Sequence, residues 1–236
     1  MRFVFPIFFL SIAMVLARPI EIEVSRGRNM NAVKLVDQAQ DQLFNKNDVA
    51  GALKSANAAI QSDPTYWPAL YVRADVLIEQ HQYAAAIRDC NAILQQDSTV
   101  VEAALLRADA NYHLGNCAAA LKEVEHCVTI HPRQDAWARA YNMRAFLHLF
   151  CRDPSIRNLP KALADAKTAC KLMAWSDGDL IDTLAMAEAA TGDFESAAKH
   201  EREAIGATKA REDEKRQYER HLGLFQQHKL LDGTSR

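Results

Sequence analysis

The sequence contains little glycine or proline, no excess of charge of one sign, and no long apolar run after its first 17 residues. Only 8 of its 236 residues are glycine and 7 are proline, which argues against a loop-rich β-sandwich or barrel and against linker-like sequence. Lysine and arginine (28) nearly balance aspartate and glutamate (30), so a nucleic-acid partner, which needs a basic surface, is not expected. Beyond residue 17 no apolar stretch approaches the roughly 20 residues of a membrane-spanning helix.

The usual catalytic and cofactor motifs are also absent. We find no Gly-rich phosphate loop, no Cys-x-x-Cys and no His-Glu-x-x-His, which would indicate nucleotide, redox or zinc chemistry. Two pairs have the four-residue spacing of metal ligands on a helix: His113 with Cys117, and Cys127 with His131. A glycine interrupts the first pair and a proline follows the second, so capped or core positions are the simpler interpretation. The sequence therefore predicts no enzyme, no metal site and no cofactor.

The N-terminus has the pattern of an export signal. Residues 1–17 combine one basic residue, Arg2, with an uncharged apolar run and a small residue, Ala17, at the expected cleavage point. We therefore predict a signal peptide over 1–17, a linker over 18–29, and a periplasmic or extracellular protein. The alternative is an uncleaved N-terminal membrane anchor.

The chain as a whole is apolar enough to fold, with 49% apolar residues. Its part beyond residue 29 repeats itself. The segment 71–75 (YVRAD) recurs 34 residues later at 105–109 (LLRAD), and a looser copy lies at 142–146. Two series of mostly small residues step by 34, 34, 42 and 35 residues. They are Ala52, Ala86, Ala120, Ala162 and Ala197, and Ala59, Ile93, Cys127, Ala169 and Ala204.

This period, with small residues midway along each helix and turn residues between helices, resembles the tetratricopeptide repeat (TPR) family. The resemblance implies an all-α fold: a right-handed superhelix of about five helix pairs. The repeats would cover 31–64, 65–98, 99–132, 135–173 and 177–206. A capping helix is expected over 207–229, where Tyr218, Leu222 and Phe225 share one face, and a tail over 230–236.

Local signals refine the helix ends. Thr99 with Glu102 predicts a capping box, and Asn158 and Asp177 predict two further N-caps. Residues 151–158 lengthen the turn of the fourth repeat by about five residues relative to the 34-residue period. The fourth and fifth repeats resemble a recurrent C-terminal pair in bacterial exported TPR proteins.

The chain has five cysteines, so at least one thiol has no partner within the chain. Cys117 is expected to begin the second helix of the third repeat, and Cys151 to end the first helix of the fourth. In a TPR stack these helices are neighbours, so a disulfide between Cys117 and Cys151 is possible in an oxidising compartment. The alternative is two buried thiols.

The resemblance also implies a concave binding face lined by the first helix of each repeat. The residues expected on it are Tyr71, Asp75, Glu79, Leu105, Asp109, Tyr112, Arg139, Asn142 and Phe146. Exposed carboxylates among aromatic anchors would favour a protein or peptide partner with basic residues.

Two alternatives to this interpretation stay open. Tyr71, Tyr112 and Phe146 could instead belong to the core between repeats, because a register error of one residue is easily made. The sequence thus predicts a non-catalytic adaptor or scaffold, with a self-associating structural module as the alternative. The oligomeric state stays open.

Overall fold

The computed structural model describes residues 29–130, 133–207 and 212–231. The predicted signal peptide, the linker up to residue 28 and the tail beyond residue 231 lie outside the described residues. The chain divides into two compact units, which we call the N-terminal unit (ending at Gln96) and the C-terminal unit (beginning at Asp97).

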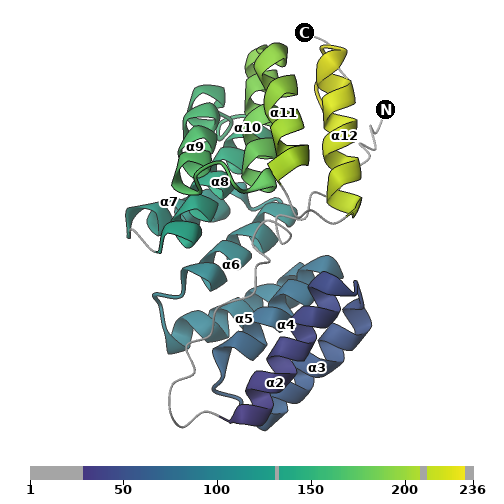
Figure 1. Ribbon diagram of the computed structural model, residues 1–236. Helices are drawn as coiled ribbons and strands as arrows, with labels where there is room; N and C mark the ends of the chain where they lie inside the picture. Colours follow the sequence, from purple (N-terminus) through teal and green to yellow (C-terminus); the bar gives the residue numbers. More distant parts are fainter. Residues whose placement is uncertain (1–28, 131–132, 208–211, 232–236) are drawn as a thin grey trace, which may run out of the picture. The chain divides into compact units, whose positions relative to one another are not determined.

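The N-terminal unit contains two helix pairs (Figure 1). Its helices are α2 (Met30–Gln40), which continues into the π-helical turn η1 (Asp41–Asn45), α3 (Val49–Ser62), α4 (Trp67–Glu79) and α5 (Tyr83–Gln96). Each helix packs on the next, and the first helices of the two pairs, α2 and α4, also contact each other.

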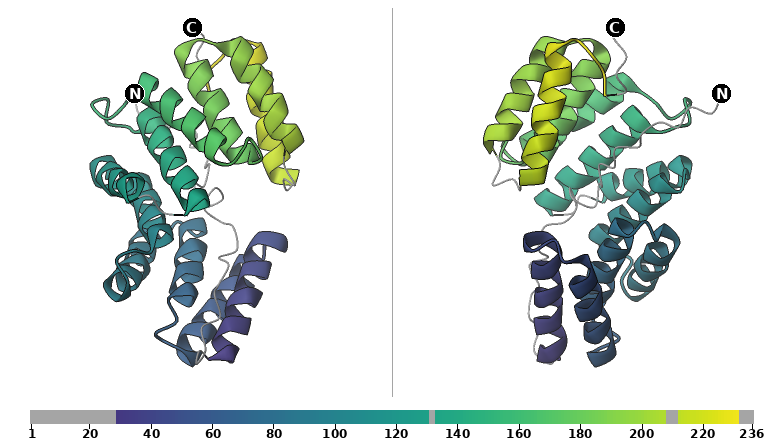
Figure 2. Two further views of the ribbon diagram at one scale, coloured as in Figure 1. Left: turned by 60° about the vertical axis from the view of Figure 1, so that its left-hand side comes forward. Right: turned by 90° about the vertical axis from the view of Figure 1, so that its right-hand side faces the viewer.

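The C-terminal unit contains three helix pairs and one additional helix (Figure 2). Its helices are α6 (Val101–His113), α7 (Cys117–Thr129), α8 (Gln134–Phe150), α9 (Leu159–Leu172), α10 (Gly178–Thr191), α11 (Phe194–Ala207) and α12 (Glu212–Gln226). Consecutive helices pack together, the first helices α6, α8 and α10 contact one another in turn, and α12 packs along α11. Each unit is therefore built, in its described residues, from helix pairs packed in chain order. None of their helices combines the length and apolarity needed to cross a bilayer.

The small residues of the repeat lie where helices cross. Alanines of the two periodic series, such as Ala52, Ala120 and Ala204, are completely buried, and Ile93 and Cys127 of the second series are buried as well. A methyl side chain lets two helix axes approach to about 8–10 Å, whereas a larger one pushes them apart. The spacing of alanine in the sequence thus marks positions that are buried between packed helices.

The turns and caps follow the sequence with one exception. Gly115 and Gly192 have φ values of 83° and 95°, a left-handed conformation that glycine adopts without strain. Asn158 and Asp177 cap α9 and α10 as expected, each accepting a hydrogen bond from a backbone N–H of the first turn. At the start of each of these helices, one backbone N–H without a partner inside the helix is thereby satisfied.

The expected capping box at Thr99 is wrong. Helix α6 begins at Val101, and its N-cap, Val100, makes no side-chain cap. The Thr99 hydroxyl instead donates to Oδ1 of Asp97 at 2.6 Å, because the preceding aspartate forms a turn that competes for this hydroxyl.

In three consecutive repeats, an ion pair joins the first helix to the second. The sequence pattern did not lead us to expect these pairs. The pairs are Arg73 with Asp89, Arg107 with Glu123, and Arg144 with Asp165. The partners are 16 residues apart in the first two pairs and 21 in the third, since the fourth repeat has the longer turn. The fifth repeat has Leu184 at the arginine position.

Candidate binding surface and buried polar cluster

The nine residues expected on the concave face lie on α4, α6 and α8, the first helices of their repeats. Only Glu79 and Tyr112 are partly exposed. The other seven are buried, with exposed fractions between 0% and 8%: Tyr71, Asp75, Leu105, Asp109, Arg139, Asn142 and Phe146. Of the nine residues expected on this face, the structure therefore leaves only Glu79 and Tyr112 accessible to solvent.

The expectation that Asp75 and Asp109 are exposed is wrong, because their side chains are 1% and 0% exposed. A helix turns by about 100° per residue, so a register error of one position exchanges a solvent-facing side chain for one that packs inward. Asp109 lies 3.4 Å from Nε2 of His113, one turn further along α6. Tyr71 and Phe146 are 2% and 6% exposed, so for these two residues the alternative, that they belong to the core between repeats, is correct.

An aromatic group remains accessible where α6 and α8 meet, and we call Tyr112, Phe146 and Phe150 the aromatic face. The rings of Tyr112 and Phe146 meet edge to face, with centroids 5.3 Å apart, and those of Phe146 and Phe150 lie 4.7 Å apart. Tyr112 and Phe150 are partly exposed. Ring pairs of this kind hold their geometry, so the accessible parts of Tyr112 and Phe150 are held in fixed positions.

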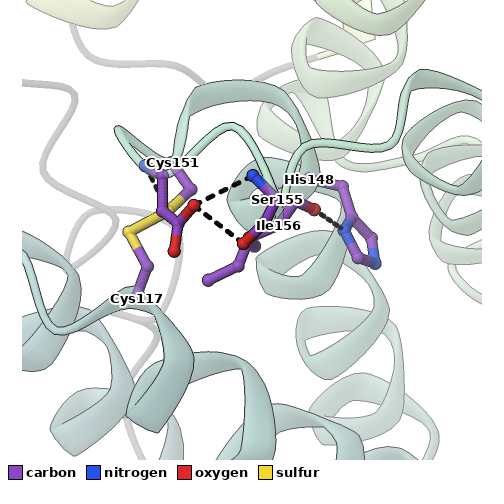
Figure 3. The surroundings of a disulfide bond; sticks show 6 residues. Cys117, His148, Cys151, Ser155 and Ile156 are labelled. Carbon is purple, nitrogen blue, oxygen red and sulfur yellow. Dashed lines mark hydrogen bonds between the residues drawn. A yellow bond between two sulfur atoms is a disulfide. The ribbon is translucent and has the colours of Figure 1, made fainter.

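A disulfide joins the two cysteines singled out in the sequence (Figure 3). Cys117 begins α7, Cys151 follows the end of α8, and their Cα atoms are 6.1 Å apart, within the usual range for a disulfide. The other three cysteines, Cys90, Cys127 and Cys170, are buried and form no disulfide with another described residue. Burial raises the pKa of Cys127 and Cys170 to about 12, which makes these thiols poor nucleophiles.

The lengthened turn after Cys151 is held by its own hydrogen bonds (Figure 3). The Asp153 carboxylate accepts bonds from the backbone N–H and the hydroxyl of Ser155, at 2.9 and 2.7 Å. Nδ1 of His148 lies 2.8 Å from the carbonyl oxygen of Ile156. These hydrogen bonds fix the conformation of the turn, and the bond from His148 connects it to α8.

A buried polar cluster lies where α10, α11 and α12 meet, and the sequence analysis missed it. Asp182, Glu201 and His221 each come from a different helix, and they are 1%, 0% and 1% exposed. Nδ1 of His221 lies 2.7 Å from Oδ1 of Asp182 and 3.8 Å from Oε1 of Glu201. In the sequence, His221 lies between Tyr218 and Phe225 on the buried side of α12. This position is the signal by which the sequence could have indicated that His221 is buried. We call Asp182, Glu201 and His221 the α12 cluster.

Further contacts of α12 surround this cluster. The Tyr218 hydroxyl donates to Oδ1 of Asp179 at 2.5 Å. Burial of the Asp179 carboxyl raises its pKa to about 7, and the negative charge of nearby Asp177 contributes to this shift. Burial and the neighbouring Asp182 raise the pKa of Glu201 well above its ordinary range. The capping helix is therefore attached through polar as well as apolar side chains.

The comparisons with known proteins identify the fold. No protein-family model matches the sequence, and no curated protein matches it. Among solved structures, a thermophilic TPR protein of Thermus thermophilus is 17% identical, covers 82% of this chain and 100% of its own, and superposes with a TM-score of 0.70. MamA of Desulfovibrio magneticus is also 17% identical, covers 76% of this chain and 96% of its own, and has a TM-score of 0.53. The chain therefore has the fold of a tetratricopeptide repeat protein.

Proposed function

We propose that this protein is an exported, non-catalytic interaction module that binds a peptide segment of a protein partner on its first helices. The observation that carries the proposal is the aromatic face, which crosses from α6 to α8 and leaves Tyr112 and Phe150 partly exposed. Rigid, half-buried aromatic rings are typical anchors for a partner because they lose little conformational entropy on binding.

The chemistry of the partner follows from what remains accessible. An apolar side chain of the peptide would pack on the exposed edges of Tyr112 and Phe150. Asp75 and Asp109, the carboxylates expected beside these rings, are buried. Recognition at the aromatic face would therefore depend on apolar contact more than on basic residues of the partner.

Export is part of the proposal. The signal pattern of residues 1–17 supports it, and the Cys117–Cys151 disulfide suits an oxidising compartment. Expression in a bacterium with secretion machinery, followed by mass spectrometry of the N-terminus, tests it. A mature chain that begins at Arg18 is the expected result, and an intact N-terminus in the membrane fraction would establish the anchor instead.

Selection of peptides from a displayed random library tests binding at the aromatic face. Enriched peptides should dissociate at least tenfold faster from Tyr112→Ala than from the unchanged protein. Tyr141→Ala is the matched control, because Tyr141 is also partly buried but contacts Trp137 and Arg144 on another side of α8. Peptides that bind Tyr112→Ala as tightly as the unchanged protein would contradict the proposal.

Light scattering during size-exclusion chromatography separates this function from self-association. Our proposal expects the same mass for the unchanged protein and for Tyr112→Ala. An oligomer of the purified chain that Tyr112→Ala dissociates would show that the aromatic face binds a second copy.

A further inference from the structure

The α12 cluster places two carboxylates and one imidazole together in the interior of the C-terminal unit. One ligand atom from each of Asp182, Glu201 and His221 lies within 4.8 Å of the other two. The residues come from three successive helices, so their convergence depends on the packing of α12. Among the residues that the structure describes, this is the group of histidine and acidic side chains with the spacing of metal ligands.

Glu201 gives an independent indication that the cluster receives a ligand. Its side chain is completely buried, and neither of its carboxylate oxygens has a hydrogen-bond partner. A buried carboxylate without such a partner is strongly destabilising. Oε1 of Glu201 faces Nδ1 of His221 at 3.8 Å, which is too far for a hydrogen bond. As an ionised carboxylate, Glu201 is therefore directed at the other two residues without accepting a hydrogen bond from either.

We propose that Asp182, Glu201 and His221 bind a divalent transition-metal ion of the zinc class, which fastens the capping helix α12 to α10 and α11. Two carboxylates neutralise the two positive charges of the ion, and neutral imidazole supplies a nitrogen ligand. Imidazole nitrogen with carboxylate oxygen suits zinc better than magnesium or calcium, which prefer oxygen alone.

The distances are compatible with one ion after a small adjustment. Zinc holds nitrogen and oxygen ligands at about 2.0–2.2 Å, so ligand atoms on one ion lie roughly 3–4 Å apart. The Asp182–His221 contact of 2.7 Å would open as the ion enters, and the 3.8 Å separation of His221 from Glu201 already suits it. The amide Nε2 of Gln217, also on α12, lies 3.4 Å from the other Asp182 oxygen, as expected for a group that orients a metal ligand.

A proton is the competing occupant. If Glu201 carries a proton, it can donate to Asp182 and the cluster is satisfied without a metal. The two occupants predict opposite effects of Glu201→Gln, because the amide imitates protonated glutamate but cannot replace a carboxylate ligand on zinc.

The test uses the full chain without an affinity tag, treated with a chelator and then desalted. Isothermal titration with zinc sulfate near pH 7.5 should show one tight ion per chain. Elemental analysis after gel filtration should recover the same stoichiometry. Affinity should fall at least tenfold in Glu201→Gln and in His221→Gln, and zinc should raise the melting temperature of the unchanged protein but not of these variants.

Glu188→Gln is the matched control. Glu188 and His200 also pair a carboxylate with an imidazole between α10 and α11, at 2.7 Å, but the structure shows no third metal-ligand side chain beside this pair among its described residues. This variant should retain full zinc binding. Circular dichroism checks that each variant is folded. If His221→Gln fails to fold, the zinc affinity of the isosteric Glu201→Gln variant tests the proposal.

Two results would overturn the proposal. The first is an unchanged protein that binds no zinc, or binds it equally well in Glu201→Gln. The second is a Glu201→Gln variant whose melting temperature, with chelator present, equals that of the zinc-treated unchanged protein, which would show that a proton occupies the cluster.

Discussion

Arg73 of α4 and Asp89 of α5 form a two-pronged ion pair. Nε and one terminal nitrogen of the guanidinium each donate to a separate carboxylate oxygen at 2.7 Å. Asp89 is buried, with 9% of its side chain exposed, whereas 28% of Arg73 is exposed. The arrangement satisfies a buried carboxylate in a planar, directional way that lysine could not reproduce.

Removing the arginine should therefore destabilise the N-terminal unit. Arg73→Met should lower the free energy of unfolding by about 1–3 kcal/mol, because it leaves the Asp89 carboxylate buried without its partner. Urea unfolding followed by circular dichroism measures this change. Lys46→Met, which breaks the exposed Lys46–Asp41 pair, serves as the control and should leave the curve unchanged. Equal effects of the two variants would contradict the structural role of the buried pair.

The disulfide should stabilise the C-terminal unit. It closes a segment of 34 residues, and replacing both Cys117 and Cys151 by serine should cost about 2–4 kcal/mol. Titration of the denatured, unreduced protein with a thiol reagent should find three free thiols rather than five. A reductant should destabilise the unchanged protein and leave the double variant as it was. Five reactive thiols in freshly purified protein would show that the bond does not form.

Overpacking at a helix crossing should be costly. Ala120 is completely buried on α7, and Ala120→Leu should destabilise by about 1–3 kcal/mol because the added carbon atoms force the helices apart. The neighbouring Ala119 is exposed on the same helix, so Ala119→Leu should change stability by less than about 0.5 kcal/mol. Thermal melts of both variants make the comparison, and a similar shift in the two would mean that Ala120 is not at a close crossing.

The stability of the metal-free protein should fall as the pH rises from about 3.8 toward 7. The pKa of Asp179 is about 7 in the folded protein against 3.8 ordinarily. Between these values the folded state keeps a proton that the unfolded state has lost, so the stabilisation is complete at low pH and disappears as pH approaches 7. Melting temperatures measured with chelator from pH 5 to 8 should decline less steeply in Asp179→Asn than in the unchanged protein.

Asp153→Asn is the control for this pH series. Hydrogen bonds from Ser155 lower the pKa of Asp153, so this group titrates below the range examined and its removal should leave the slope unchanged. A slope in Asp179→Asn as steep as that of the unchanged protein would mean that Asp179 is not the titrating group.

The sequence predicts the architecture because the information is periodic and local. Alanine recurs at buried positions of each repeat, and glycine or asparagine often stands where the backbone turns. Helix pairs can therefore be located without knowing the tertiary structure. The Cys117–Cys151 pair could be proposed for the same reason, since the repeat itself makes α7 and α8 neighbours.

The sequence predicts the functional surfaces less well, because they depend on side-chain direction. Asp75 and Asp109 look like solvent-facing carboxylates in a helical pattern, yet both are buried. The contact between Asp182, Glu201 and His221 combines positions on three helices, and no motif spacing links them. Polar side chains inside a solenoid become visible only when the rotation of each helix about its axis is known.

The position of the disulfide also determines where the array can open. Repeat proteins contact only their neighbours, so fluctuations that expose the backbone begin at the ends of the stack. Helices α9 to α12 follow Cys151 and can separate one after another, whereas α7 and the end of α8 stay tethered. In the metal-free protein, amide hydrogen exchange should therefore be slow in α7 and α8 and progressively faster toward α12. Reduction should accelerate exchange in α7 and α8 most strongly, and an exchange pattern unaffected by reduction would show that the tether does not limit opening.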